Sequence, residues 1–98
     1  MILTAAKIME RAIKTYGKAG QLTKAVEEMS ELQKELCKAI TEGTDANARS
    51  RINQEMADVE IMLEQLYMIF DNRNVVNAWV KEKLLRLEAR MNREEKHE

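Results

Sequence analysis

Proline is absent from this 98-residue chain, and glycine and aromatic residues are scarce: there are three glycines, two tyrosines, one tryptophan and one phenylalanine. Apolar residues nevertheless make up 45% of the chain and charged residues 34%. This composition is typical of an all-helical globular protein rather than of a disordered one, and β structure is not expected. The length allows one small domain, which buries only part of its surface.

Cysteine and histidine each occur once. A lone Cys37 excludes a disulfide framework or a CxxC metal pair within one chain, and its place beside Leu36 and Ile40 predicts a small core residue. His97 lies in the charged run EEKHE, where a frayed terminus is expected rather than a metal ligand. No apolar run is long enough to span a bilayer. We therefore expect a cytoplasmic protein with no membrane partner.

An excess of basic residues, typical of nucleic-acid-binding domains, is also missing, because the formal net charge is -1. The charge is unevenly distributed, with +4 over residues 1–26, -7 over residues 27–71 and +2 over residues 72–98. The acids are concentrated in the middle of the chain. Nucleic acid is therefore not an expected partner.

Apolar residues recur at helical spacing in four segments. We expect helices over residues 3–15, 22–41, 51–70 and 75–91. Residues 46–50 are compatible with either a loop or the start of the third helix. The sequence predicts an all-α, four-helix bundle over residues 1–92, followed by a charged tail over residues 93–98. The small core predicts that homo-oligomerisation completes this bundle.

The expected breaks carry residues that commonly begin or end helices. Gly17 and Gly20 bracket the first break, and Gly43 would end the second helix. Thr44 or Asp45 could cap the third helix, and Asn74 is a good N-cap for the last one.

Two of these helices carry acids three residues apart: Glu28 with Glu31, and Glu55 with Asp58. Residues at this spacing are neighbours on a helix surface, so each pair can direct two carboxylates to one point. Like charges repel there unless a cation is present. Mg²⁺ takes oxygen ligands and usually keeps several waters that a phosphate can replace. The pattern therefore indicates a magnesium site of four carboxylates on two helices.

A solvated, charged helix face is the alternative, because acids at this spacing arise by chance in a chain rich in glutamate. At about 100° of rotation per residue, Glu55 falls about 40° from the centre of its apolar stripe, which is a core position. A carboxylate there needs a cation, a partner or water. Glu28 lies roughly 100° from the centre of its own stripe and Glu31 further round. Both would face a site only if their helix is covered on two sides.

The runs QLTKAVEEMSELQKEL and EMADVEIML resemble the EExxE and ExxD motifs of the all-α nucleoside triphosphate pyrophosphohydrolases, the MazG-like group. The resemblance covers residues 21 to about 66. It implies that Glu28, Glu31, Glu55 and Asp58 bind Mg²⁺, or Mn²⁺ as a substitute, and act in catalysis, with Glu27 as an auxiliary acid. The implied reaction converts a (deoxy)nucleoside triphosphate to the monophosphate and pyrophosphate.

The last helix of this family usually carries a lysine and arginines that meet the triphosphate, and EKLLRLEARM resembles that segment. The implied substrate-binding residues are Lys83, as the best match, with Lys81, Arg86 and Arg90 as weaker candidates. These cations could equally lie on the solvent-exposed side of an amphipathic helix. Leu87 stands where some relatives carry asparagine or arginine. Trp79 or Tyr16 could stack on a base, although a lone Trp on an apolar helix face is more often core or interface.

The sequence leaves three hypotheses open. The first is a house-cleaning enzyme that removes non-canonical or surplus nucleotides and assembles, as relatives usually do, into a homodimer or homotetramer. The second, within the same fold, is a phosphoribosyl-ATP pyrophosphohydrolase. The third is a non-catalytic helical interaction or regulatory module.

Overall fold

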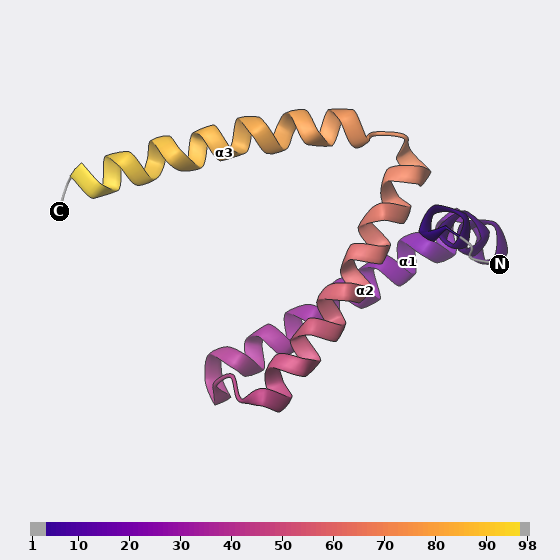
Figure 1. The fold of residues 1–98 in the computed structure, drawn as a ribbon, viewed down its shortest axis with the longest axis horizontal. Coiled ribbons are helices and arrows are strands. Elements are labelled where there is room, and N and C mark those ends of the chain that lie inside the picture. The colour runs from indigo at the N-terminus through magenta and orange to yellow at the C-terminus, as the bar shows by residue number, and fades with distance from the viewer. Residues whose placement is uncertain (1–3, 97–98) are drawn as a thin grey trace.

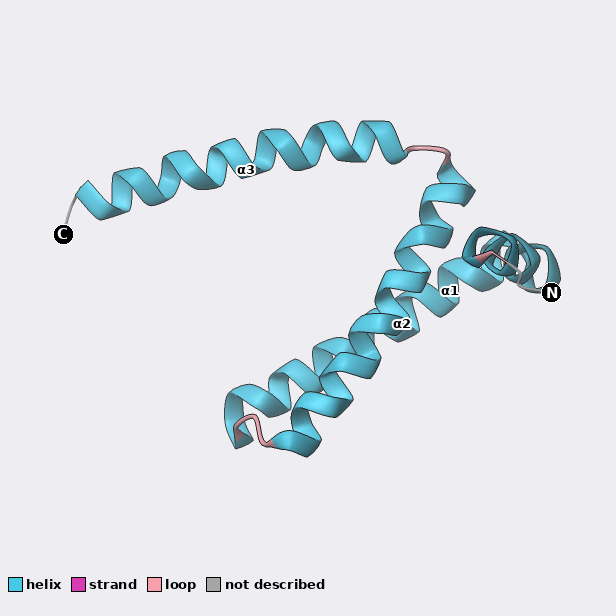
Figure 2. Ribbon diagram, viewed as in Figure 1, coloured by secondary structure: helices cyan, strands magenta, loops and turns pink. Residues whose placement is uncertain are grey.

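The structure is a computed structural model that describes residues 4–96, and these residues form three helices and no strand (Figures 1 and 2). Helix α1 covers Ala5–Glu42, α2 covers Ala46–Phe70 and α3 covers Arg73–Lys96. The prediction of an all-helical chain is confirmed. Within the described residues, no helix combines the length and the apolar character needed to cross a membrane.

Helix α1 joins the first two expected helices across a kink at Gly17, whose φ is 80° and ψ 158°. Glycine adopts such a positive φ at little cost because it has no Cβ. The expected turn from Gly17 to Gly20 is therefore a single non-helical residue. In Figure 1 the segment before the kink is seen almost end-on, whereas the rest of α1 lies across the view. The expected start at residue 3 lies outside the described residues.

The α1–α2 connection has the expected cap chemistry. Gly43 ends α1 with a φ of 88°, and the Asp45 side chain caps α2 by accepting a hydrogen bond from the backbone N–H of Ala48 at 2.8 Å. Helix α2 therefore begins at Ala46, and residues 46–50 are helical.

The boundaries of α3 correct two expectations. The helix begins at Arg73, so Asn74 lies inside its first turn and is not the N-cap. Residues 93–96, expected in a charged tail, continue the helix to Lys96, because arginine, glutamate and lysine are all good helix formers. His97 lies outside the described residues.

Helices α1 and α2 pack side by side, whereas α3 turns away and makes almost no contact with either (Figure 1). The chain measures 55 × 36 × 28 Å, with a radius of gyration of 17.4 Å. A compact domain of this length would have a radius of about 13 Å. A single chain is therefore a helical hairpin with a projecting third helix. The four-helix bundle completed by homo-oligomerisation stays a prediction.

The seam between α1 and α2 contains polar as well as apolar side chains. Its buried residues are Gln21, Ala25, Glu35, Ala48, Met62 and Gln65. The apolar stripe expected to form the core of α1 lies largely outside this seam, with Val26 65% and Ile40 84% exposed. Cys37, expected in the core, is exposed as well. The side of α1 that faces α2 is the one that carries Gln21, Ala25 and Glu35, and not the most apolar side.

Candidate metal site and adjoining groove

Three carboxylates from two helices converge in the α1–α2 seam. Glu28 of α1 and Glu55 and Asp58 of α2 each offer one oxygen, and these oxygens lie within 4.8 Å of one another. The three-residue spacing of Glu55 and Asp58 places both on the same side of α2, where Glu28 meets them across the seam. We call these three residues the acidic cluster. Carboxylate oxygens are the ligands that hard divalent cations prefer, so the cluster could hold such an ion.

The electrostatics of Glu55 are those of an acid without a partner. Its side chain is half-buried, and its Oε2 is shielded from solvent with no hydrogen-bond donor among the described residues. Partial burial, followed by the charges of Asp58 and Glu28, raises the pKa of Glu55 above its ordinary value. Partial burial and the charge of Glu28 likewise raise the pKa of Asp58. A divalent cation would satisfy the unpartnered oxygen and offset this repulsion, so the donor set fits one.

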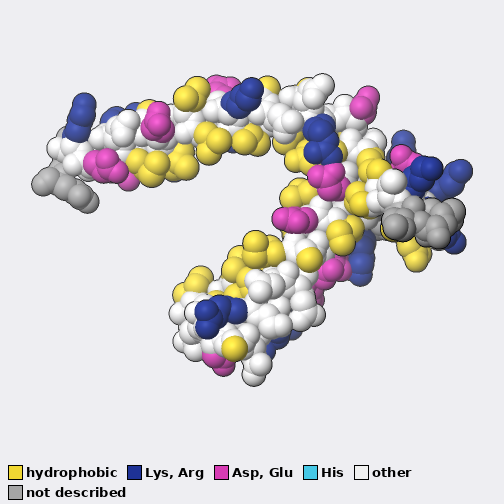
Figure 3. Space-filling model, in the orientation of Figure 1, with side chains coloured by type: hydrophobic (Ala, Val, Ile, Leu, Met, Phe, Trp, Pro, Cys, Tyr) yellow, Lys and Arg dark blue, Asp and Glu magenta, His cyan; other side chains and the backbone are white. Residues whose placement is uncertain are grey.

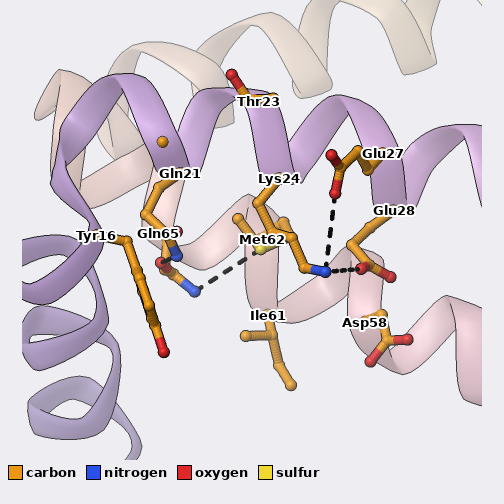
Figure 4. Close-up of a pocket in the computed structure, with 11 residues that line it drawn as sticks. Tyr16, Gln21, Thr23, Lys24, Glu27, Glu28, Asp58, Ile61, Met62 and Gln65 are labelled. Atoms are coloured by element: carbon orange, nitrogen blue, oxygen red, sulfur yellow. Dashed lines mark hydrogen bonds and ion pairs between the residues drawn. The ribbon is translucent and has the colours of Figure 1, made fainter.

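Lys24 brings a positive charge to the edge of the acidic cluster. Its Nζ lies 3.0 Å from Glu28 Oε1 and 3.8 Å from Glu27 Oε2 (Figure 4). The hydrogen bond and charge of Glu28 raise the pKa of Lys24. Lys24 therefore neutralises the α1 side of the cluster and leaves Glu55 unpaired. Sequence reasoning missed this residue, although its four-residue spacing from Glu28 is the usual one for an ion pair on a helix.

The fourth expected ligand, Glu31, does not join the other three. It is exposed on α1 and is not one of the residues whose oxygens converge. Its charge still contributes to the raised pKa of Glu55, so it lies within electrostatic reach. Helix periodicity had placed Glu31 at the surface, and the structure agrees. Glu27, the expected auxiliary acid, is also exposed.

The expected substrate-binding cations lie elsewhere. Lys83, Arg86 and Arg90 line a shallow hollow on α3 together with Leu87. Lys81 is exposed on the same helix and does not line this hollow. Because α3 projects away from the seam, none of the four reaches the acidic cluster within one chain (Figure 1). Trp79, also on α3, is 50% exposed.

A groove of about 620 Å³ extends from the acidic cluster along the seam towards the kink in α1 (Figure 4). This volume is in the range of small-molecule sites. Its acidic end is formed by Glu27, Glu28 and Asp58, and its kink end by Tyr16, Gly20, Gln21 and Gln65, with Thr23, Lys24, Ile61 and Met62 between them.

Two buried glutamines close the kink end of the groove. The Gln21 Nε2 donates to the Gln65 Oε1 at 2.7 Å, and the two residues are only 6% and 3% exposed. The sequence did not identify them as functional candidates. The available signal was the position of Gln21 four residues before Ala25 and seven before Glu28, which places all three on one side of the helix.

An ionic contact between α1 and α2 crosses the seam further along. The Arg51 Nε donates to the Glu35 Oε2 at 3.1 Å, and the Lys38 Nζ lies 3.6 Å from Glu35 Oε1. The hydrogen bond from Arg51 is the main cause of the lowered pKa of Glu35. Glu35 is thus satisfied by protein groups, unlike Glu55, and we assign it a structural role.

Comparisons with protein-family models, with curated proteins and with solved structures find no match to this chain. We therefore infer the function from the motifs of the sequence and the geometry of the seam.

Proposed function

We propose that this protein is a Mg²⁺-dependent nucleoside triphosphate pyrophosphohydrolase that cleaves the bond between the α and β phosphates. The observation that carries the proposal is the convergence of carboxylate oxygens of Glu28, Glu55 and Asp58, together with the unpartnered Oε2 of Glu55. An adjoining groove with room for a nucleotide and the resemblance of the motifs to the MazG-like group support it. The proposed role is removal of non-canonical or surplus nucleotides.

In this proposal Glu28, Glu55 and Asp58 hold the Mg²⁺, for which Mn²⁺ is a possible substitute. The chemistry that such an ion supplies is neutralisation of phosphate charge and activation of a water molecule as the nucleophile. Glu31, exposed beside the cluster, is the proposed base that accepts the proton of that water. Lys24 lines the groove and would turn from Glu28 to a phosphate oxygen once a cation neutralises Glu28.

The proposal includes assembly into a homodimer or homotetramer. Large apolar side chains are exposed on all three helices, including Val26, Phe70 and Leu84. Such surfaces on a small chain mark contacts with a partner. A second copy would also be able to bring Lys83, Arg86 and Arg90 to a triphosphate that they do not reach within one chain.

The test is pyrophosphate release from a panel of canonical and modified triphosphates, with Mg²⁺ and with a chelator. We expect one monophosphate per pyrophosphate, dependence on Mg²⁺, and a loss of activity of at least about 100-fold in Glu55→Gln, as for removal of a group that stabilises the transition state. The matched control is Glu60→Gln, at an exposed acid of α2 outside the acidic cluster, which should keep its activity.

Two other outcomes would replace the proposal. Hydrolysis of phosphoribosyl-ATP alone, included in the same panel, would assign the chain to that reaction. Absence of pyrophosphate release from every compound, with the helical fold intact by circular dichroism, would favour a non-catalytic interaction module.

A further inference from the structure

The kink end of the groove carries polar side chains, two of them buried, and Lys24 and Met62 separate it from the acids (Figure 4). The proposed phosphate chemistry does not use this end. Figure 4 shows Tyr16, Gln21 and Gln65 gathered at this end, with Lys24 and Met62 between them and the carboxylates of Glu28 and Asp58. The two ends therefore differ in chemistry. One suits a cation and phosphate, and the other suits a neutral group with its own hydrogen bonds.

The two glutamine amides have hydrogen-bonding capacity that the protein does not fill. Each carries two N–H donors and an acceptor oxygen. Among the described residues, one bond joins them, from the Gln21 Nε2 to the Gln65 Oε1, and the Gln65 Nε2 meets the Met62 Sδ at 3.8 Å. A thioether is a weak acceptor. Because both amides line the groove, a ligand that presents a donor and an acceptor side by side could use their remaining hydrogen-bonding groups.

The surroundings of the amides favour a flat ring. Tyr16 is 69% exposed and stands at one side of the groove, so the face of its ring is available for stacking (Figure 4). Ile61 and Met62 supply an apolar surface on α2. An aromatic face beside an amide edge is the arrangement with which proteins bind nucleobases, through stacking and paired hydrogen bonds.

We infer that the kink end of the groove is a nucleobase subsite, in which Tyr16 stacks on the ring and the Gln21–Gln65 pair hydrogen-bonds to its edge. The inference rests on the proposed function, because the phosphates would then lie between Lys24 and the acidic cluster. An apolar segment of a second chain in the same place would leave the remaining hydrogen-bonding groups of both amides without partners.

Binding of products, which needs no hydrolysis, tests the subsite. The four deoxynucleoside 5′-monophosphates and ribose 5-phosphate are titrated with Mg²⁺ into the full chain and followed by NMR. We expect at least one monophosphate to bind at least about 10-fold more tightly than ribose 5-phosphate, because one paired hydrogen-bonding edge gives roughly 10- to 100-fold discrimination. Equal affinity of ribose 5-phosphate and all four monophosphates, or no binding, would overturn the inference.

Substitutions at the exposed tyrosine locate the base without disturbing the seam. Tyr16→Ala should weaken monophosphate binding about 10-fold through lost stacking, and Tyr16→Phe, which keeps the ring, should bind like the wild type.

A substitution in the glutamine pair tests the hydrogen bonds to the base. Gln65→Met, close in volume but apolar, should reduce the preference among the four bases. Unchanged affinity in Tyr16→Ala together with unchanged preference in Gln65→Met would contradict the assignment.

The two proposals fail separately. Base-dependent binding that requires Tyr16, without pyrophosphate release, would support the nucleobase subsite and contradict the proposed reaction. Pyrophosphate release with no dependence on the base or on Tyr16 would support the proposed reaction and contradict the subsite.

Discussion

Glu35 and Glu55 are glutamates of the same seam whose pKa values are shifted in opposite directions. Glu35 faces Arg51 and Lys38, and its pKa is lowered. Glu55 is partly buried beside Asp58 and Glu28, and its pKa is raised. The two glutamates differ in their counter-charges, since Arg51 and Lys38 supply them to Glu35 and no described residue forms an ion pair with Glu55. The acidic cluster is therefore the place where a cation from solution would stabilise the fold.

Replacing Glu55 by Gln should stabilise the metal-free protein at neutral pH. A carboxyl whose folded pKa is raised above its ordinary value of 4.5 destabilises the fold when it is ionised. That penalty develops as the pH rises from about 4.5 through the raised value. Urea denaturation with a chelator should therefore show a larger free energy of unfolding for Glu55→Gln at pH 7.5 and a smaller difference at pH 4. A less stable variant at pH 7.5 would contradict the assigned repulsion.

Replacing Glu35 by Gln should have the opposite effect. Because the folded pKa of Glu35 lies below its ordinary value of 4.5, its contribution is present above that pH and is lost as the pH falls through the lowered value. The same measurement should show Glu35→Gln less stable than the wild type at pH 7.5, with the deficit shrinking below pH 4. A deficit that does not change with pH would mean that lost packing, not the Arg51 contact, explains it.

At the scale of the helix, the kink of α1 sets where the groove ends, because Tyr16 precedes Gly17 directly. A Cβ at Gly17 would meet nothing within 4 Å, yet the φ of 80° is unfavourable for any other residue. Gly20 is helical, and a Cβ there would meet the Tyr16 Cβ at an ordinary 3.7 Å. The two glycines therefore differ in backbone conformation and not in available space.

This difference predicts opposite effects of the same substitution. Gly17→Ala should lower the free energy of unfolding by about 1 kcal/mol through backbone strain. Gly20→Ala should raise it by roughly 0.5–1 kcal/mol, as alanine does at a helical glycine. Urea denaturation of both variants and of the wild type measures these changes in the free energy of unfolding. Stabilisation by Gly17→Ala would show that the kink is not a strained feature of the fold.

How far the sequence predicted the structure depends on the range of each interaction. The helical character of the expected segments, the role of Gly43 and the Asp45 cap depend on neighbours in sequence, and these predictions are confirmed. Glu55, expected at a core position, is half-buried. The expected core position of Cys37 was wrong, because local periodicity does not determine which side of α1 faces α2. The hydrogen bond between Gln21 and Gln65 joins residues 44 apart, and no local pattern indicates it.

At the scale of the whole molecule, the chain leaves its most apolar surfaces uncovered. Figure 3 shows hydrophobic side chains along the concave side of α3. Val80 is 48% and Leu84 58% exposed, and their four-residue spacing places them on one side of α3. A hairpin whose seam is this polar buries little apolar area, and small chains of that kind usually gain stability from association.

Association should therefore depend on one side of α3. Sedimentation of the wild type should show a dimer or tetramer, and Leu84→Glu should shift it towards the monomer because a charge would enter the apolar contact. Leu85→Glu is the matched control, since Leu85 is 67% exposed but lies about 100° further around the helix. A monomeric wild type, or equal effects of both variants, would contradict the proposed contact.

The proposed function requires that Glu28, Glu55 and Asp58 hold one divalent ion. We would test this by titrating the full chain with Mn²⁺ and following the free ion by electron paramagnetic resonance. We expect one tight site per chain in the wild type and in Glu60→Gln, affinity at least about 10-fold weaker in Glu55→Gln, and competition by Mg²⁺. Equal Mn²⁺ binding in Glu55→Gln and the wild type, or none in either, would contradict the account.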